Sequence, residues 1–209
     1  MVFISGGGNY KQTSPLDEKF FERCRKILYV PVGLKRNFSG YEQCWEWFSE
    51  VCAAHDFNMN GVDMCLRLEE VEDIYNYDGI YIGGASDSNW LNFILLDSGF
   101  ANKLAMYLEN GGNIYGGSAG GILLGQVLDM KGKSALKLLP FSILSHYSGN
   151  ESLISLYFAS NNHPLVILHE DSGIIYDGQA IKSVGYHPAH IYFTETQHSI
   201  MKETIILDV

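Results

Sequence analysis

The segment from Gly111 to Gly125 constrains the fold more than any other part of the chain. A short apolar run, Asn113 to Tyr115, leads into a glycine-rich turn around Ser118, and an apolar, helix-like run follows. Where a strand turns sharply into a helix, the residues two before and two after the turn must be small, because strand and helix approach closely. Gly116 and Gly120 meet this requirement. The segment therefore predicts a strand, a sharp turn and a helix.

A serine at such a turn suggests chemistry. The geometry lifts the Ser118 hydroxyl clear of the sheet, as in the nucleophile elbow of serine hydrolases. The N–H of Ala119, at the helix N-terminus, then points to the place where an oxyanion would develop. The alternative is a glycine-rich turn whose serine only caps the helix. We favour the catalytic interpretation because four of the five residues from Gly116 to Gly120 are glycine or alanine.

Other apolar runs end in glycine in the same way. Val2 to Ser5 leads into Gly6-Gly7-Gly8, and Gly79 to Ile82 leads into Gly83-Gly84, while Ile27 to Val32 is another β-rich run. Continuous apolar runs of this kind are typical of strands buried on both faces. The glycines after the first run lack the third glycine of G-x-G-x-x-G and no clear helix follows at once, which disfavours a dinucleotide site.

Helix-like segments alternate with these strands. Helical spacing predicts helices near 16–24, 89–96 and 100–108, and Ser39 with Glu42 forms a capping box for a helix to about His55. The last thirty residues are rich in β-branched and aromatic residues and predict closing antiparallel strands. We expect an α/β fold with a doubly wound, mostly parallel sheet and helices on both faces. Without a repeat or linker, residues 1–209 are predicted to form a single domain.

Composition excludes several classes of function. The net charge of −10 argues against nucleic-acid binding, which needs clustered Lys and Arg. No eighteen apolar residues run together and the N-terminus has no basic n-region, so we expect no membrane span and no signal peptide. We therefore expect a cytoplasmic protein. The four cysteines form no C-x-x-C pair and are expected to be thiols, although a disulfide remains open.

A catalytic serine needs a base, and the base needs an acceptor that holds its tautomer. Among the seven histidines, His146 is the best candidate because it ends an apolar strand-like run beyond the serine turn. A core histidine bonded to a backbone carbonyl explains that position equally well. Glu170 ends the next strand-like run and Asp129 follows the turn helix, so either carboxylate is a candidate acid. Placement at a strand end favours Glu170.

The histidines give little support for a metal centre. His187 and His190 are three residues apart, but Pro188 lies between them and no third ligand is evident. His169-Glu170 is not followed by the second histidine of H-E-x-x-H. We predict neither a metal nor another cofactor.

Taken together, several segments resemble one family. They are Ser5 to Gly8, Ile27 to Pro31, Ile82 to Gly84, Gly117 to Gly120 and Phe141 to Tyr147. In this order they resemble the serine peptidases similar to dipeptidase E (an aspartyl dipeptidase) and cyanophycinase. The resemblance covers about residues 1 to 180. It implies a fold like that of the class I glutamine amidotransferases, whose turn carries cysteine where this chain has serine.

The resemblance also implies roles for individual residues. Ser118 would be the nucleophile, His146 the general base and Glu170 the acid, with Asp129 as the alternative acid. The N–H of Gly84 or Ala85 would join that of Ala119 in the oxyanion hole. The implied substrate is a small peptide or a peptide-like amide.

Three departures from the family pattern bear on specificity. The loop that usually reads Gly-Gly-Gly-Asn-Thr here continues as Ala85-Ser86-Asp87, and Ser145 stands where proline often precedes the histidine. Members that cleave next to aspartate place arginines after the histidine, whereas this chain has no arginine beyond Arg67. Because bidentate carboxylate recognition favours arginine, specificity for aspartyl dipeptides is not expected.

The leading hypothesis is a serine-type peptidase, a dipeptidase or a hydrolase of small peptides or isopeptides. A second possibility is an α/β-hydrolase esterase, in which Asp171 or Asp177 and His198 would complete the triad. The third is a family member with altered loops that binds a small ligand without catalysis. Both a monomer and a homodimer remain open.

Overall fold

The computed structural model describes residues 1–34, 40–196, 198–201 and 205–207. Its centre is an eight-stranded sheet in the order β12-β9-β8-β1-β5-β4-β2-β3. The strands that run parallel to one another are β1 (Val2–Ser5), β5 (Asn113–Gly117), β4 (Gly79–Ile82), β2 (Ile27–Val30) and β3 (Val62–Met64). The antiparallel strands are β8 (Ser172–Tyr176), β9 (Ala180–Gly185) and β12 (Ile205–Ile206). This arrangement confirms the predicted mostly parallel α/β sheet with antiparallel closing strands.

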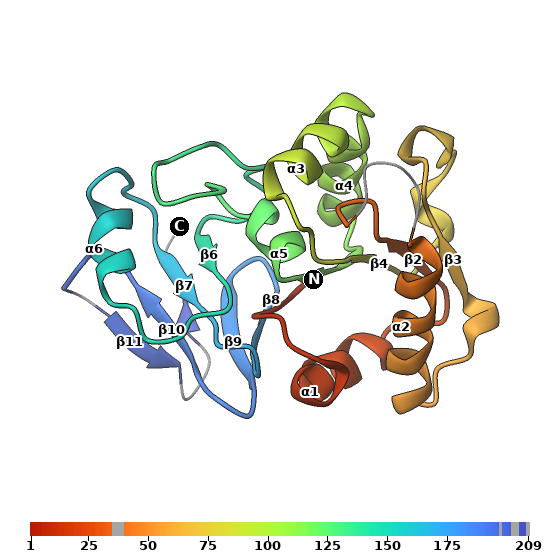
Figure 1. The fold of residues 1–209 in the computed structure, drawn as a ribbon, viewed down its shortest axis with the longest axis horizontal. Coiled ribbons are helices and arrows are strands. Elements are labelled where there is room, and N and C mark those ends of the chain that lie inside the picture. The colour runs from red at the N-terminus through yellow and green to blue at the C-terminus, as the bar shows by residue number, and fades with distance from the viewer. Residues whose placement is uncertain (35–39, 197, 202–204, 208–209) are drawn as a thin grey trace.

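Helices cover both faces of this sheet (Figure 1). The first face carries α1 (Tyr10–Phe21) and α2 (Tyr41–Ala54), and the second carries α3 (Ser88–Asp97), α4 (Phe100–Glu109) and α5 (Ala119–Leu124). Short 3-10 turns at 59–61, 68–70 and 74–76 connect strands at the β3 edge. The doubly wound layout follows from strands that bury apolar side chains on both faces.

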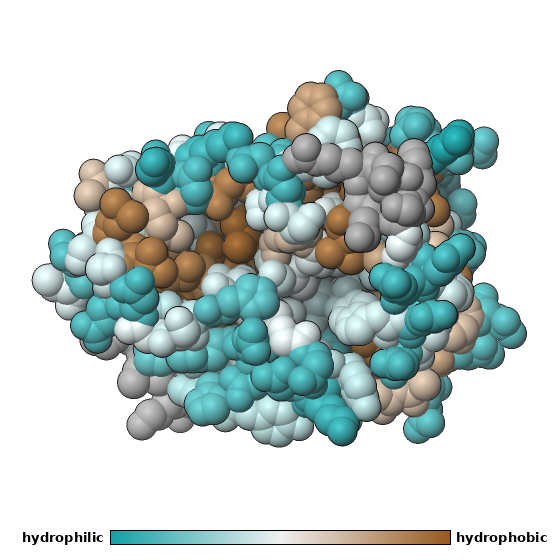
Figure 2. Space-filling model, in the orientation of Figure 1, coloured by the Kyte–Doolittle hydropathy of each residue, from teal (hydrophilic) through white to brown (hydrophobic). Residues whose placement is uncertain are grey.

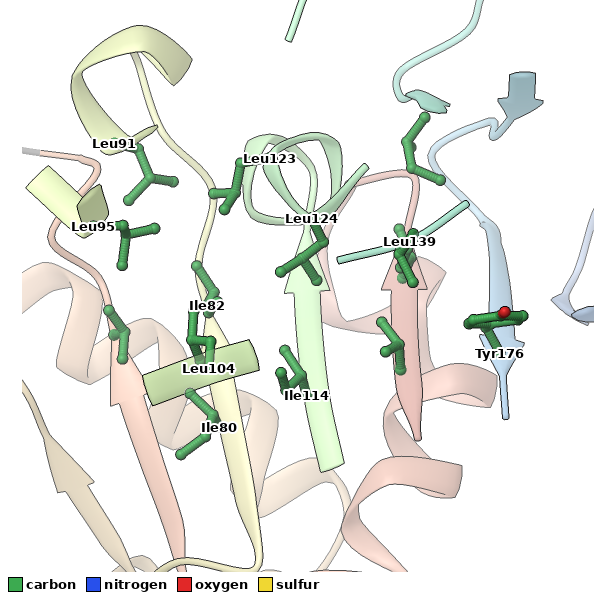
Figure 3. Packing of buried hydrophobic residues seen from close by; sticks show 14 of the residues in the cluster. Ile80, Ile82, Leu91, Leu95, Leu104, Ile114, Leu123, Leu124, Leu139 and Tyr176 are labelled. Carbon is green, nitrogen blue, oxygen red and sulfur yellow. The ribbon is translucent and has the colours of Figure 1, made fainter. Parts of the chain in front are cut away.

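The core on the second face consists mainly of aliphatic side chains. Figure 3 shows leucines from the helices meeting isoleucines from the central strands. The labelled leucines of α3, α4 and α5 are Leu91, Leu95, Leu104, Leu123 and Leu124, and they share a cluster with Ile80, Ile82 and Ile114. All of these side chains are at most 1% exposed, so the helices are fixed to the sheet mainly by burial of apolar surface.

The core on the first face is aromatic. In register across four neighbouring strands lie Phe3, Tyr115, Tyr81 and Tyr29. The rings of Tyr81 and Tyr115 are stacked at 4.2 Å between centroids. We call these four residues the aromatic row. The next residues on the same face toward the strand ends are small, namely Ser5, Gly117 and Gly83, so space is left beyond the row.

A second sheet, which the sequence did not predict as a separate unit, lies beside the first. Its four strands are β11 (His198–Met201), β10 (Ala189–Tyr192), β7 (Leu165–Ile167) and β6 (Ser142–Leu144), in that order. Helix α6 (Ser152–Phe158) packs against it through Ile154 and Tyr157. Figure 1 shows this small sheet at one end of the molecule, next to β8 and β9.

One predicted helix start needs correction, and the predicted cap of another falls on a residue that the structure does not describe. Helix α1 begins at Tyr10, directly after the glycines, because Asn9 and Gln12 form a capping box. The prediction that no helix follows these glycines at once was therefore wrong. Helix α2 begins at Tyr41 after Gly40, whose φ of 84° is the left-handed conformation that glycine tolerates. The predicted cap at Ser39 lies outside the described residues.

The outer surface follows the amphipathic patterns. On the face drawn in Figure 2, hydrophilic residues cover much of α1 and α2, and hydrophobic residues gather at the end that carries α6 and the small sheet. In the described part of the chain no helix is long and apolar enough to cross a membrane. All four cysteines are free thiols and are buried, which removes the disulfide alternative.

Candidate active site

Ser118 lies at the turn between β5 and α5. Its backbone has φ 51° and ψ −116°, an unusual conformation for a residue with a side chain. Three backbone hydrogen bonds hold the turn. The N–H of Ser118 donates to the Ser5 carbonyl at 3.2 Å, and the Ser118 carbonyl accepts from Gly121 and Ile122 at 2.9 and 3.0 Å. The strand, sharp turn and helix predicted from the sequence are all present.

The glycines around Ser118 are required by packing. A Cβ added at Gly116 would lie 2.7 Å from the backbone of Gly121, and one at Gly120 would lie 2.4 Å from the Ile82 carbonyl oxygen. Such distances are too short for any side chain. The predicted need for small residues on both sides of the serine therefore has a direct structural cause: β5 and β4 touch the first turn of α5.

His146 reaches the serine from the small sheet. It follows β6, and its Nε2 lies 2.6 Å from Ser118 Oγ. The backbone of His146 has φ 53°, and its N–H donates to the Gly6 carbonyl at 3.0 Å. This hydrogen bond ties the segment after β6 to the loop after β1, so the ring is presented across the edge of the large sheet.

Glu170 lies on the other side of the imidazole. Its Oε1 is 3.2 Å from His146 Nδ1, which matches a donor N–H at Nδ1 and a lone pair at Nε2. The amide nitrogen of Gln12 approaches Glu170 Oε2 at 3.5 Å, a long contact, while Gln12 Oε1 accepts from the Asn9 N–H at 3.0 Å. The cap of α1 thus contacts the carboxylate, a role that the sequence reading missed.

The run Gly6-Gly7-Gly8 is fitted to these side chains. A Cβ at Gly7 would lie 2.2 Å from the His146 ring, and one at Gly6 would lie 1.9 Å from the His169 carbonyl oxygen. Gly7 and Gly8 also have φ of 108° and 95°, in the left-handed region that favours glycine. These glycines, whose function the sequence reading left open, let the histidine and acid segments pack against the end of β1.

The alternative acid, Asp129, is engaged in its own loop. Its Oδ1 accepts the backbone N–H groups of Lys131 and Lys133 at 2.9 and 3.1 Å. Asp129 thus caps a turn, whereas Glu170 contacts the histidine.

The residues of the esterase alternative lie elsewhere. Asp171 contacts His187, with 2.6 Å between Oδ2 and Nδ1, and Asp177 accepts from the N–H groups of Gln179 and Ala180 in a tight turn. The side chain of His198 lies outside the described residues. The partner of Ser118 in the structure is therefore His146.

The oxyanion hole was predicted to use the N–H of Ala119 together with that of Gly84 or Ala85. Ala119 is the first residue of α5, so no preceding turn of the helix supplies an acceptor for its N–H. Gly84 lies beside the serine, since a Cβ at Gly84 would be 3.7 Å from the Ser118 Cβ. Ala85 follows Gly84 and lines the same pocket. Gly84 and Ala85 thus line the same pocket as Ser118, and Ala119 directly follows the serine at the start of α5.

A pocket of about 620 Å³ opens at Ser118 and His146. It extends over the aromatic row and between α1 and α2. Its lining includes Thr13, Tyr29, Cys44, Trp47 and Tyr81. The volume falls in the range typical of small-molecule sites.

Beneath this pocket a carboxyl group is completely buried. Asp17 on α1 accepts hydrogen bonds from the hydroxyls of Tyr115 at 2.5 Å and Thr13 at 2.6 Å. Burial raises the pKa of Asp17 to about 6, and the two hydrogen bonds oppose the shift. In the described part of the chain no basic side chain pairs with it in a salt bridge.

His187 and His190, the pair considered as a metal site, lie near a third histidine, His169. The ring of His169 lies 5.9 Å from that of His187 and 6.4 Å from that of His190, between centroids. Among the described residues, however, no group of three or more His, Cys, Asp or Glu side chains has the geometry to hold a metal ion.

Comparison with known proteins identifies the family. The model of peptidase family S51 matches residues 1–184. Among solved structures, the chain is similar to a protein from Listeria monocytogenes EGD-e provisionally named as a peptidase E. The two share 16% sequence identity with a TM-score of 0.64, over 87% of this chain and 96% of that one. No significant match was found among curated proteins. Because the family model covers most of the chain, the protein belongs to peptidase family S51 and is a serine-type peptidase.

Proposed function

We propose that the protein hydrolyses an amide bond of a dipeptide, or of a similarly small peptide or isopeptide, with Ser118, His146 and Glu170 as its catalytic triad. The observation that carries this proposal is the continuous contact from Ser118 Oγ to His146 Nε2 at 2.6 Å and from His146 Nδ1 to Glu170 Oε1 at 3.2 Å. A serine becomes a nucleophile when a base accepts its proton, and this arrangement supplies one.

In the first step, Ser118 Oγ attacks the carbonyl carbon and its proton passes to His146 Nε2. The resulting imidazolium is stabilised by the carboxylate of Glu170. His146 then gives the proton to the leaving amine as the C–N bond breaks, which leaves an ester on Ser118. Water, deprotonated by the same histidine, attacks this ester and releases the acid.

The negative charge that develops on the carbonyl oxygen requires donors. The N–H of Ala119 and the N–H of Gly84 or Ala85 are the donors that we assign to this charge, because they flank Ser118 on the side of α5 and β4. The pocket of about 620 Å³ at Ser118 supports a substrate of the size of a dipeptide.

The test is covalent labelling with a fluorophosphonate probe, which reacts with an activated serine. The wild-type protein should be labelled at one site, identified by peptide mass mapping as Ser118, and Ser118→Ala should not be labelled. Ser86→Ala is the matched control, because Ser86 lines the same pocket and is assigned no chemical role.

Labelling that persists in a folded Ser118→Ala protein would reject Ser118 as the nucleophile. A wild-type protein that is never labelled, but whose melting temperature rises with a small ligand, would instead favour a binding function. The melting temperature of each variant, measured by circular dichroism, establishes that it is folded.

A further inference from the structure

The pocket beside Ser118 has a chemical character that the proposed function does not use. Strand order divides its lining into two parts. His146 packs against Gly7, which follows β1, whereas Tyr81 and Tyr29 belong to β4 and β2. In the large sheet β1 and β4 are neighbours of β5 on opposite sides. The histidine and the tyrosines therefore lie on opposite sides of the strand that presents Ser118.

This division orients a bound substrate. The leaving amine has to lie against His146, which protonates it, and the carbonyl oxygen has to face Ala119 and Gly84. The remaining substituent of the carbonyl carbon is the acyl residue, and it must extend away from the histidine. Its side chain then enters the part of the pocket over Tyr81 and Tyr29.

That part of the pocket is aromatic. Its floor is the end of the aromatic row, and its wall is Trp47 of α2, whose ring meets that of Tyr81 edge to face at 6.3 Å. Gly83 and Gly117 leave the space open, since they follow Tyr81 and Tyr115 on the same face of the sheet. Tyr29 on β2 also lines this part of the pocket.

The described lining offers no partner for a charged side chain. It contains no Lys, Arg, Asp or Glu in the parts of the chain that the structure describes. Asp17 lies behind the aromatic row, where its carboxylate accepts hydrogen bonds from the hydroxyls of Tyr115 and Thr13. A carboxylate entering the part of the pocket over Tyr81 and Tyr29 would lose its hydration against aromatic rings, which is unfavourable.

We propose that this chain is selective for a large aromatic acyl residue, with Tyr29, Trp47 and Tyr81 as the residues that determine the choice. The proposal rests on the catalytic function proposed above and adds the substrate class. Aromatic side chains bind such surfaces through edge-to-face and offset contacts in addition to apolar burial.

Hydrolysis of four dipeptides, Phe-Leu, Leu-Leu, Ala-Leu and Asp-Leu, tests the proposal. The value of kcat/KM for Phe-Leu should exceed that for Asp-Leu by roughly tenfold or more, the discrimination that one pocket commonly achieves. Trp47→Ala should lower the ratio of kcat/KM for Phe-Leu to that for Ala-Leu roughly tenfold. The melting temperature and fluorophosphonate labelling at Ser118 report that the variant is folded and that its serine is reactive.

A charge-introducing variant gives a second arm. Gln43 is exposed and lines the pocket, so Gln43→Arg should raise kcat/KM for Asp-Leu relative to Phe-Leu. Glu46→Arg is the matched control on the same helix: its site is exposed and outside the pocket lining, and it should leave the ratio unchanged.

Binding to the inactive Ser118→Ala protein separates the two proposals. Tighter calorimetric binding of Phe-Leu than of Asp-Leu supports the substrate class even if turnover fails. Equal or higher kcat/KM for Asp-Leu, in a protein that the fluorophosphonate labels at Ser118, overturns the substrate class and leaves the catalytic proposal standing. Absence of both labelling and dipeptide binding overturns both.

Discussion

The large and the small sheet contribute to the site in different ways. The large sheet holds Ser118 through backbone packing, since β4, β5 and α5 approach so closely that Gly116 and Gly120 admit no Cβ. The segments after β6 and β7 contribute His146 and Glu170, whose side chains are 48% and 53% exposed. The proposed nucleophile is thus fixed by packing within the large sheet and its helix, whereas the proposed base and acid come from other segments, which contacts such as that of the His146 N–H with the Gly6 carbonyl hold against this sheet.

The two parts of the site therefore differ in how much substitution they tolerate. A packed turn tolerates almost no substitution and therefore leaves a clear pattern in the sequence. Exposed side chains that meet across a sheet edge need only the right end groups, so their pattern is weak. The predictions that follow probe each side of the comparison, beginning with the largest expected effect.

The first prediction tests whether the two sheets act as one catalytic unit. Ser118→Ala and His146→Ala should each lower kcat for Phe-Leu by roughly 10⁴- to 10⁶-fold, and the double variant should lose no more than either single one. Loss of the serine and loss of its base abolish the same step, the attack by the activated hydroxyl. Removing both residues therefore costs no more than removing one. Steady-state rates of the three purified variants measure this, and multiplicative losses would contradict a shared step.

The second prediction separates the two candidate acids. Glu170→Gln keeps the shape of the side chain but removes the charge that stabilises the imidazolium, so kcat should fall by roughly 10²- to 10⁴-fold. Asp129→Asn, which alters a turn cap, should stay within about threefold. The same hydrolysis assay measures both variants. A larger loss in Asp129→Asn than in Glu170→Gln would reverse the assignment.

The third prediction concerns Asp17, the carboxyl that the large sheet buries. Its pKa is about 6 in the folded protein against an ordinary 3.8. The folded state therefore holds more protons between these values, and stability falls as pH rises through this window. From pH 4 to pH 8, wild-type protein should lose roughly 2–3 kcal/mol relative to Asp17→Asn, at about 1.36 kcal/mol per pH unit.

Urea unfolding of both proteins at several pH values measures this difference. If the unfolding free energies of wild type and Asp17→Asn change in parallel with pH, the assigned pKa of Asp17 is wrong. Exposed carboxylates on both sheets are common to the two proteins and cancel in the comparison.

The fourth prediction tests the close packing at the serine turn. In Gly120→Ala the new Cβ would meet the carbonyl oxygens of Ile82 and Gly83 at 2.4 and 2.8 Å, so the variant should lose about 1–3 kcal/mol of stability. Gly117→Ala is the matched control, because its Cβ would meet no atom closer than 3.8 Å. It should change stability by about 0.5 kcal/mol or less. Thermal unfolding measures both, and equal losses would contradict the packing argument.

Much of the large sheet could be predicted from the sequence. Val2–Ser5, Gly79–Ile82 and Asn113–Gly117 are strands as expected, because apolar runs that end in glycine can be buried on both faces. The helix after the first glycines was missed although its signal, Asn9 followed by Gln12, is a capping box. The small sheet was missed as a unit because its strands are short and β8 and β9, which lie between β7 and β10 in the chain, belong to the large sheet.

For the candidate site, too, local sequence predicts some features, and others depend on contacts between distant segments. The sequence by itself determined that Ser118 lies at a sharp strand-to-helix turn, since only small residues satisfy the backbone contacts there. The sequence also indicated His146 as the base and Glu170 as the acid, but it left Asp129 open as an alternative acid. Which side chains meet follows from the tertiary structure, because the 2.6 Å contact joins segments of two sheets and the 3.2 Å contact joins the segments after two different strands of the small sheet. The aromatic pocket is of the same kind: strand register aligns Tyr29, Tyr81 and Tyr115, and no local pattern encodes register between distant strands.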